Sequence, residues 1–399
     1  MAFDFTSIIP RQGHDALAVE ALGLGSYPKP PKEGFDPIPM WVADMSFPTV
    51  PAIPQALAQR AAHPLYGYFL PTEAYYQAII TWQQRRNGVT GLEAQHIGYE
   101  NGVLGGLITA LNVFCSRGEE VLIHSPTYIG FTNSLLGAGY RIALSPLVLD
   151  GDNIWRMDFA DMEKKFRDRK IRTMIFCSPH NPTGRVWERS ELEELAALCR
   201  RYDVSVICDE IWSDLLMPGR THIPLQQVNE DMKQRTVALY APSKTFNLAG
   251  LVGSYHIAYN PRLRLRLEKE GSVSHYNNMN VLSMHALIAG YSAEGEAWLE
   301  ELRQVICGNV DLACASLAQH APQVRLSRPQ GTYMLFLDCT DWCAQKGKSL
   351  DELLQAGWDV GVAWQDGRPF HGPCHIRMNL ALPRSRAEEA FRRLEQYVW

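Results

Sequence analysis

The sequence lacks the features typical of membrane proteins, nucleic-acid-binding proteins and metal–thiolate proteins. No apolar run is long enough to cross a bilayer, and the first residues lack the cationic and apolar segments of a signal peptide. The net charge is −5 and no basic run occurs, so neither nucleic acid nor a membrane surface is expected as a partner. The nine cysteines include no CxxC pair, which favours reduced thiols in the cytoplasm over a metal site.

The pattern of apolar segments predicts an α/β protein with two domains. The chain has 399 residues and no internal repeat or low-complexity segment, and this length favours more than one core. Apolar segments alternate with predicted helices, of which residues 189–202 are an example. Strands that are apolar on both faces and separated by helices indicate a mostly parallel sheet. The predicted strands are residues 121–124, 174–177, 204–208, 236–240 and 253–258.

The last third of the sequence has a different pattern. A long predicted helix over residues 293–319 is followed by short strand patterns and by a helix that begins at Ser385. The strand patterns are residues 324–326, 332–337 and 375–379. We therefore expect a large domain over residues 48–285. A smaller α+β domain would combine the irregular N-terminal arm, residues 1–47, with residues 286–399.

Three polar residues follow predicted strands of the large domain in an order that indicates chemistry. Asn181, Asp209 and Lys244 each lie at the carboxyl end of a predicted strand. Taken alone, the lysine would be exposed and the aspartate would cap a helix. Together they fit a pyridoxal phosphate site, in which Lys244 carries the cofactor as a Schiff base and Asp209 faces the pyridine nitrogen. Asn181 would donate to the ring hydroxyl.

Other residues match the remaining parts of the same cofactor. Asn101-Gly102 precedes an apolar helix, so the backbone N–H groups of Val103 and Leu104 can bind a phosphate. The hydroxyl of Ser243 can add a further donor. Tyr128, in a loop after a predicted strand, can stack on the ring, although such a tyrosine is more often a packing residue.

Arg377 is the candidate for binding a substrate carboxylate. It alternates with Ile376 and Met378 in a predicted strand, so its side chain can face one side while the apolar neighbours face the other. A guanidinium group binds a carboxylate through two parallel hydrogen bonds. A surface position is the alternative, and Arg384 is a weaker candidate for the same role.

These segments together resemble the aspartate aminotransferase superfamily of fold type I pyridoxal phosphate enzymes. The matching motifs are Ser-Pro-His-Asn-Pro-Thr-Gly at 178–184, Asp-Glu-Ile at 209–211, Ser-Lys at 243–244 and Ile-Arg-Met-Asn at 376–379. Within the superfamily the chain is similar to the MalY/PatB-type C–S β-lyases, or cystathionine β-lyases. Supporting segments are residues 40–45, 66–68, 241–250, 329–333 and 382–385.

The resemblance implies a seven-stranded large sheet and a homodimer with sites at the subunit interface. Tyr68 would reach the neighbouring subunit's cofactor phosphate and take part in catalysis. Residues 41–45, with Trp41 and Asp44, would line the substrate entrance. Ile211 would contact the cofactor, and Tyr333 the substrate.

The resemblance also implies the reaction, an α,β-elimination that converts cystathionine or a related cysteine S-conjugate to a thiol, pyruvate and ammonia. Val252 stands where many aminotransferases of the superfamily have an arginine, which favours the lyase branch. Ser46 replaces the aspartate usual in that branch, and Ala241 lacks a hydroxyl that some relatives offer the phosphate. Two alternatives remain: an aminotransferase acting on a small or aromatic amino acid, and a regulatory protein that binds a transcription factor.

Overall fold

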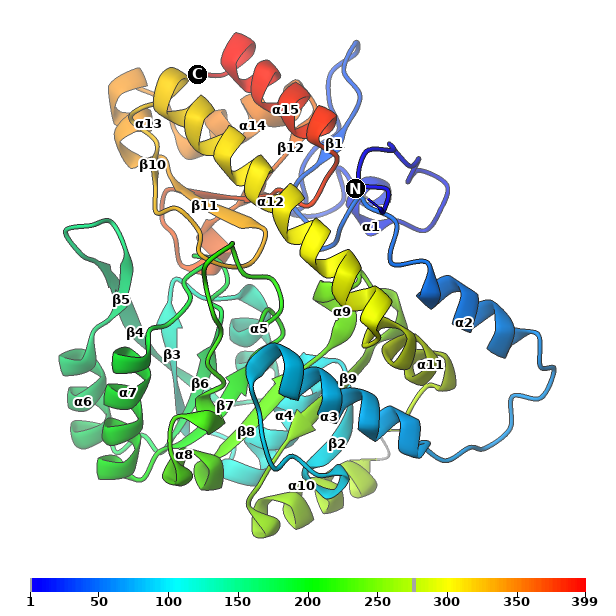
Figure 1. Ribbon diagram of the computed structural model, residues 1–399. Helices are drawn as coiled ribbons and strands as arrows, with labels where there is room; N and C mark the ends of the chain where they lie inside the picture. Colours follow the sequence, from blue (N-terminus) through cyan, green and yellow to red (C-terminus); the bar gives the residue numbers. More distant parts are fainter. Residues whose placement is uncertain (1, 275–277) are drawn as a thin grey trace.

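An eight-stranded sheet is the framework of the larger lobe in this computed structural model, which describes residues 2–274 and 278–399 (Figure 1). The five central strands run parallel, and the flanking strands β2, β9 and β5 pair antiparallel. In spatial order the strands are β2 (Ile97–Asn101), β9 (Gly253–Ile257), β8 (Thr236–Tyr240), β7 (Ser205–Asp209), β6 (Thr173–Cys177), β3 (Glu120–Ser125), β4 (Arg141–Leu149) and β5 (Trp155–Met157). The mostly parallel sheet is confirmed. The three-residue β5 makes it one strand wider than expected, because it pairs locally with the end of β4.

Helices cover both faces of this sheet, which explains its nearly continuous apolar strands. One face packs on α4 (Val103–Phe114), α5 (Ile129–Gly137) and α10 (Pro261–Ser274). The other face packs on α3 (Glu73–Asn87), α6 (Phe159–Asp168) and α7 (Arg189–Tyr202). Along β6, Ile175 belongs to the first core and Met174 and Phe176 to the second. Alternating side chains therefore enter opposite cores, as strand geometry requires.

The smaller lobe contains a four-stranded antiparallel sheet. Its order is β10 (Arg325–Leu326), β11 (Met334–Asp338), β14 (His375–Asn379) and β13 (Gln365–Asp366). The helices α13 (Thr340–Lys346), α14 (Leu350–Asp359) and α15 (Arg384–Tyr397) complete it. Within the N-terminal arm, β1 (Ile38–Pro39) pairs parallel with β12 (Val362–Ala363). This pairing joins the arm to the C-terminal third, although the domain boundaries stay a prediction.

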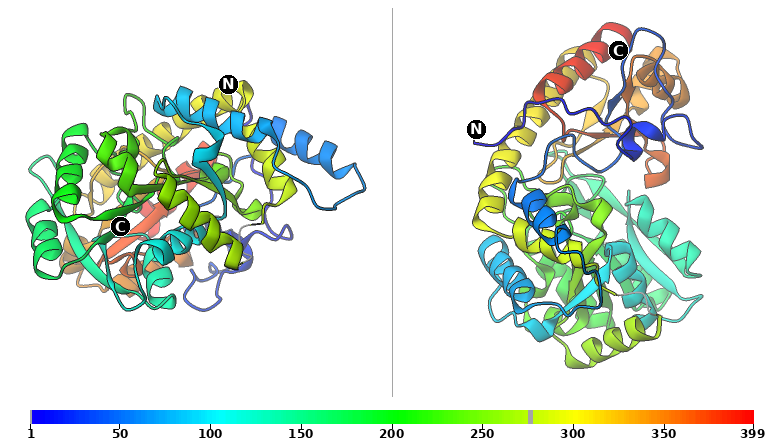
Figure 2. Two further views of the ribbon diagram at one scale, coloured as in Figure 1. Left: turned by 90° about the horizontal axis from the view of Figure 1, so that it is seen from below. Right: turned by 90° about the vertical axis from the view of Figure 1, so that its right-hand side faces the viewer.

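The helix α12 (Ala293–His320) runs along both lobes (Figures 1 and 2). It contacts α15 in the smaller lobe and α11 (Val281–Gly290) in the larger one. The remaining helices are α1 (Leu17–Glu20), α2 (Ala52–Ala61), α8 (Glu230–Arg235) and α9 (Pro242–Thr245). Throughout the described ranges, no helix combines the length and the apolar character needed to span a membrane.

The loop after β6 is fixed to the smaller lobe at Gly184. The carbonyl of Gly184 accepts hydrogen bonds from Gln330 N at 2.8 Å and from Gly331 N at 2.9 Å. Gly184 has a φ of +69°, and a Cβ atom there would lie 2.5 Å from Cβ of Pro329. Only glycine meets both the conformational and the steric requirement at this junction.

We predict that Gly184→Ala destabilises the protein more than Gly219→Ala does. Gly219 has a similar φ of +79°, but a Cβ atom added there would meet no other atom within 4 Å. The conformational penalty of about 1–2 kcal/mol applies to both variants. Gly184→Ala should lose about 1–3 kcal/mol more through overpacking. Denaturant unfolding measures both variants, and equal losses would contradict the role given to this junction.

Candidate active site

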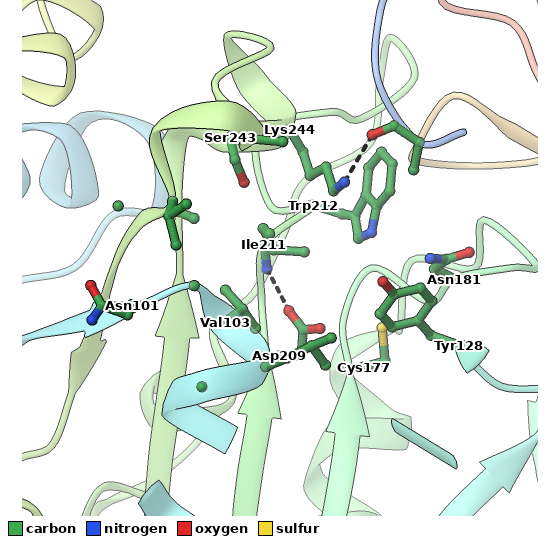
Figure 3. A pocket seen from close by; sticks show the side chains of 18 residues that line it. Asn101, Val103, Tyr128, Cys177, Asn181, Asp209, Ile211, Trp212, Ser243 and Lys244 are labelled. Carbon is green, nitrogen blue, oxygen red and sulfur yellow. Dashed lines mark hydrogen bonds between the residues drawn. The ribbon is translucent and has the colours of Figure 1, made fainter. Parts of the chain in front are cut away.

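A cavity of about 350 Å³ lies at the carboxyl ends of β6, β7 and β8 and the N-terminus of α4 (Figure 3). Parallel strands place their carboxyl ends at one edge of a sheet, where ligand sites of such folds form. The register places Cys177, the last residue of β6, beside Asp209, the last residue of β7. Predicted site residues that line the cavity are Gly102, Val103, Leu104, Tyr128, Asn181, Asp209, Ile211, Ser243 and Lys244.

Asp209 is a buried carboxylate at the floor of this cavity. Its Oδ1 accepts a hydrogen bond from Ile211 N at 3.0 Å. Burial raises the pKa of Asp209 to about 7, against the opposing effects of the Ile211 N–H and the Lys244 charge. The described residues give it no ion-pair partner within salt-bridge distance. A buried charge of this kind is stabilised by a cationic ligand, which matches a protonated pyridine nitrogen.

Lys244 lies on α9, which begins directly after β8. Its Nζ donates to the carbonyl oxygen of Ala43 at 2.8 Å and lies 5.7 Å from the centre of the Trp212 ring. Burial, followed by the nearby Arg377 charge, lowers the pKa of Lys244 to about 8, although Asp44 and Asp209 oppose this shift. About a tenth of the amine is therefore unprotonated at pH 7, far more than for an ordinary lysine, and the unprotonated form is the one that acts as a nucleophile or base.

The part of the cavity at the N-terminus of α4 is suited to bind an anion. Gly102, with a φ of +78°, precedes α4, and the first hydrogen bond of the helix runs from Gly106 N to Gly102 O at 3.1 Å. The N–H groups of Val103 and Leu104 therefore have no acceptor inside the helix. Ser243 lines the same cavity. Helix N–H groups together with a hydroxyl fit a phosphate group.

Tyr128 and Asn181 form the side of the cavity nearest the smaller lobe. The Tyr128 ring faces the cavity, and burial raises the pKa of its hydroxyl (Figure 3). The side-chain oxygen of Asn181 accepts from Nη1 of Arg377 at 3.3 Å. Its amide nitrogen lies on the cavity side (Figure 3). Asn181 can therefore bridge Arg377 and a ligand oxygen.

Arg377 is buried on β14, behind Asn181, and does not itself line the cavity. Its Nη2 donates to the carbonyl of Trp41 at 2.8 Å and to Oε1 of Gln365 at 2.6 Å, and its guanidinium lies 4.4 Å from the centre of the Phe370 ring. Burial lowers the pKa of Arg377 to about 10. Its Nε has no hydrogen-bond partner among the described residues, and no carboxylate there forms an ion pair with it. These properties suit a carboxylate ligand.

Residues 41–45 form a wall between the arm and the cavity, held by side chains from both lobes. Besides Lys244, the hydroxyl of Tyr333 donates to Ala43 O at 3.0 Å. Nδ2 of Asn379 donates to the carbonyls of Val42 and Asp44, each at 2.6 Å. The side chain of Asn247 pairs with the Met45 backbone through two 3.0 Å hydrogen bonds.

The two residues of this wall that the sequence singled out differ in orientation. Trp41 faces Arg377 only with its carbonyl, because its indole donates to Ala18 O at 2.9 Å and packs beneath the arm. Asp44 forms an ion pair with Arg11. Ala43, which no sequence pattern singled out by itself, is the residue of the wall that lines the cavity.

Trp212 and Cys177 were missed by reasoning from the sequence. Trp212 lies three residues after Asp209 and lines the cavity, with its ring against Tyr333 at a centroid distance of 4.7 Å. Its position just after a candidate site residue could have indicated it. Tyr68 does not line this cavity and is fully exposed in a loop between α2 and α3. Its predicted contact involves a second subunit and stays a prediction.

We predict that Asp209→Asn stabilises the cofactor-free protein at pH 8. The pKa of Asp209 in the folded protein, about 7, exceeds its ordinary value of 3.8, so folding takes up a proton between these values. Stability is therefore lost as pH rises through this window. Removing the charge should restore a free energy on the order of 4 kcal/mol at most. The gain should shrink towards pH 4 and be absent in the exposed control Asp341→Asn. Parallel unfolding profiles of wild type and Asp209→Asn between pH 4 and pH 8 would contradict this.

Comparison with known proteins places the chain in a family. The family model of aminotransferase class I and II matches residues 36–394. Cystathionine beta-lyase PatB from Bacillus subtilis is 32% identical over 90% of this chain and 92% of its own length. Protein MalY from Escherichia coli is 29% identical over 97% of this chain and 96% of its own.

Solved structures agree with this placement. A pyridoxal-phosphate-bound C–S lyase from Staphylococcus hominis has a TM-score of 0.89 and 29% identity, covering 100% of this chain and 98% of that one. A pyridoxal-phosphate-bound putative aminotransferase from Clostridium difficile 630 has a TM-score of 0.90 and 30% identity, covering 98% and 99%. The chain therefore belongs to the aminotransferase class I and II family, in the branch that contains PatB and MalY.

Proposed function

We propose that this protein is a pyridoxal-phosphate-dependent lyase that cleaves the carbon–sulfur bond of cystathionine or a related cysteine S-conjugate. The products are a thiol, pyruvate and ammonia. The observation that carries the proposal is that Lys244 lies between a site that fits the cofactor and a site that fits the substrate carboxylate. Asp209 and the N-terminus of α4 fit the two ends of the cofactor, and Arg377 fits a substrate carboxylate. The names of PatB and of the Staphylococcus hominis lyase support the reaction type.

Within one subunit, each proposed cofactor-binding role belongs to a residue that lines the cavity. Lys244 would bind the cofactor covalently, and Asp209 would pair with its ring nitrogen. Val103, Leu104 and Ser243 would hold its phosphate, with Gly102 allowing close approach of the backbone. The list is completed by Tyr128 and Ile211 at the ring and Asn181 at its hydroxyl. When bound, the cofactor supplies an acceptor for the negative charge that develops at the substrate Cα.

Lys244 is also the proposed general base. Its lowered pKa, about 8, allows the free amine to remove the Cα proton near neutral pH. Arg377 would fix the substrate carboxylate, and Asn181 links that guanidinium to the cofactor site. The walls formed by Ala43, Trp212 and Tyr333 limit the space for water around the amine.

The protein is further proposed to act as a cytoplasmic homodimer. Four large side chains of the loop between α2 and α3 are at least 60% exposed, namely Leu65, Tyr66, Tyr68 and Leu70. An exposed apolar segment of this kind is typical of a protein interface. A second subunit would cover it and allow Tyr68 to reach the phosphate in the neighbouring site. Nine free cysteines support a reducing compartment.

Transamination is the second candidate, because one solved relative is described as a putative aminotransferase. It would use the same cofactor contacts and the same base. The two reactions differ only in where the proton taken from Cα is delivered and in whether the group at Cβ leaves.

We predict that the purified holoenzyme releases pyruvate from L-cystathionine without any added 2-oxo acid. Lys244→Ala should lower this rate by about two to four orders of magnitude, because it removes the base. Lys346→Ala, on the surface of α13, is the matched control. A lactate-dehydrogenase-coupled assay measures the pyruvate. Strict dependence on a 2-oxo acid acceptor would instead identify an aminotransferase.

We also predict that Arg377→Ala raises the apparent KM about tenfold to a hundredfold, because a charge-assisted contact with the substrate carboxylate is lost. Arg325→Ala, an arginine at an exposed position of the same sheet, should leave KM unchanged. Steady-state kinetics on L-cystathionine measures both. A thermal unfolding curve of Arg377→Ala shows whether the variant is folded, and an unchanged KM in a folded variant would exclude the assigned role.

A further inference from the structure

A second cavity adjoins the active site and has no role in the chemistry described above. It has a volume of about 350 Å³ and is lined by residues that include Arg11, His14, Asp44, Ser46 and Asn247. Ala249 lines both this cavity and the one that contains Lys244. Asp44 follows Ala43, whose carbonyl accepts the hydrogen bond from the Lys244 amine. The linings of the two cavities are therefore joined at Ala249 and at the Ala43–Asp44 peptide, on the side of the N-terminal arm.

Opposite charges face each other in this cavity. Arg11 of the arm forms an ion pair through Nη2 with Oδ2 of Asp44, and its Nη1 donates to Oδ1 of Asp44 at 3.2 Å. The side chains of Arg11 and Asp44 are 18% and 20% exposed, so both are accessible from the cavity.

With Ser46 as its neighbour, Arg11 keeps N–H groups that can donate to a ligand. Nη1 of Arg11 donates to Oγ of Ser46 at 3.3 Å, a neutral acceptor. Among the described residues, Asp44 is therefore the one carboxylate paired with Arg11. An aspartate at position 46 would add a second anion beside Arg11 and compete with any incoming carboxylate. Serine keeps the guanidinium available to a ligand.

We propose that the Arg11–Asp44 pair binds a zwitterionic amino-acid group at the far end of the substrate, beyond sulfur. Arg11 would take its carboxylate and Asp44 its ammonium, so that two ion pairs replace one. This inference rests on the proposed function and names its substrate class, cysteine conjugates that end in an α-amino acid. In L-cystathionine that group lies four bonds beyond Cβ, and Asp44 directly follows Ala43, the residue that the Lys244 amine contacts.

The test compares substrates with and without the distal group in Arg11→Gln. Loss of a charged contact should lower kcat/KM for L-cystathionine about tenfold to a hundredfold and leave that for S-methyl-L-cysteine within about twofold. Ser46→Asp should shift the two substrates in the same unequal way while it keeps Arg11. Arg325→Gln, which removes an exposed arginine elsewhere, should change neither value.

Binding of a non-cleavable probe separates this inference from the proposed reaction. Calorimetry on the holoenzyme compares L,L-diaminosuberate, in which a methylene group replaces sulfur, with L-norleucine, which lacks the distal group. Arg11→Gln should weaken only the first. If no substrate yields pyruvate but this difference persists, the lyase proposal fails and the distal site stands. Equal losses for both ligands, or no loss for either, would overturn the distal site.

Discussion

The arrangement of the active site depends on one buried carboxylate, Asp209. Its burial at the end of β7 carries a free-energy cost, which its raised pKa of about 7 records. The Ile211 N–H and the more distant Lys244 charge reduce this cost without removing it. A cationic ring nitrogen held against Asp209 would stabilise the carboxylate, and the carboxylate would in turn keep the ring protonated. The charged form of Asp209 is therefore unfavourable in the free protein and becomes favourable when the ligand binds.

The active site also requires that the smaller lobe keeps a fixed position relative to Asp209. Residues 41–45 connect the lobes, because their carbonyls accept hydrogen bonds from Lys244 of the larger lobe and from Arg377, Asn379 and Tyr333 of the smaller one. These contacts fix the distance between the amine and the guanidinium. A substrate bound by Arg377 would therefore meet the base in a defined orientation, which contributes strongly to rate. The same segment carries Asp44 towards the second cavity.

Much of the framework could be predicted from the sequence, since local patterns determine it. The limits of α7, β8 and β14 follow from apolar periodicity and flanking polar residues. Strand β2 was not predicted, because Gly98, Tyr99 and Glu100 form no apolar alternation and the strand is stabilised by its pairing with β9. The short β5 likewise depends on its partner β4. Pairings of this kind depend on tertiary contacts, so the local sequence pattern does not indicate them.

In the candidate site, too, some residues could be predicted from local sequence patterns and others depend on tertiary contacts. Lys244, Asp209 and Asn181 were identified because each lies at or just beyond the carboxyl end of a strand, and the structure brings all three to one cavity. The contact of Ala43 O with Lys244 Nζ spans 201 residues, and the Arg11–Asp44 contact spans 33. Neither has a sequence pattern of its own. The orientation of Trp41, with its indole under the arm and its carbonyl towards Arg377, is likewise set by packing that no motif encodes.

The central claim is that Lys244 binds the cofactor in a site defined by Asp209. The most direct test is borohydride reduction of the holoenzyme, followed by proteolysis and mass spectrometry. A pyridoxyl group is expected on the peptide that contains Lys244, and on no other lysine peptide. A modified lysine elsewhere, or a holoenzyme that yields no modified peptide, would contradict the claim.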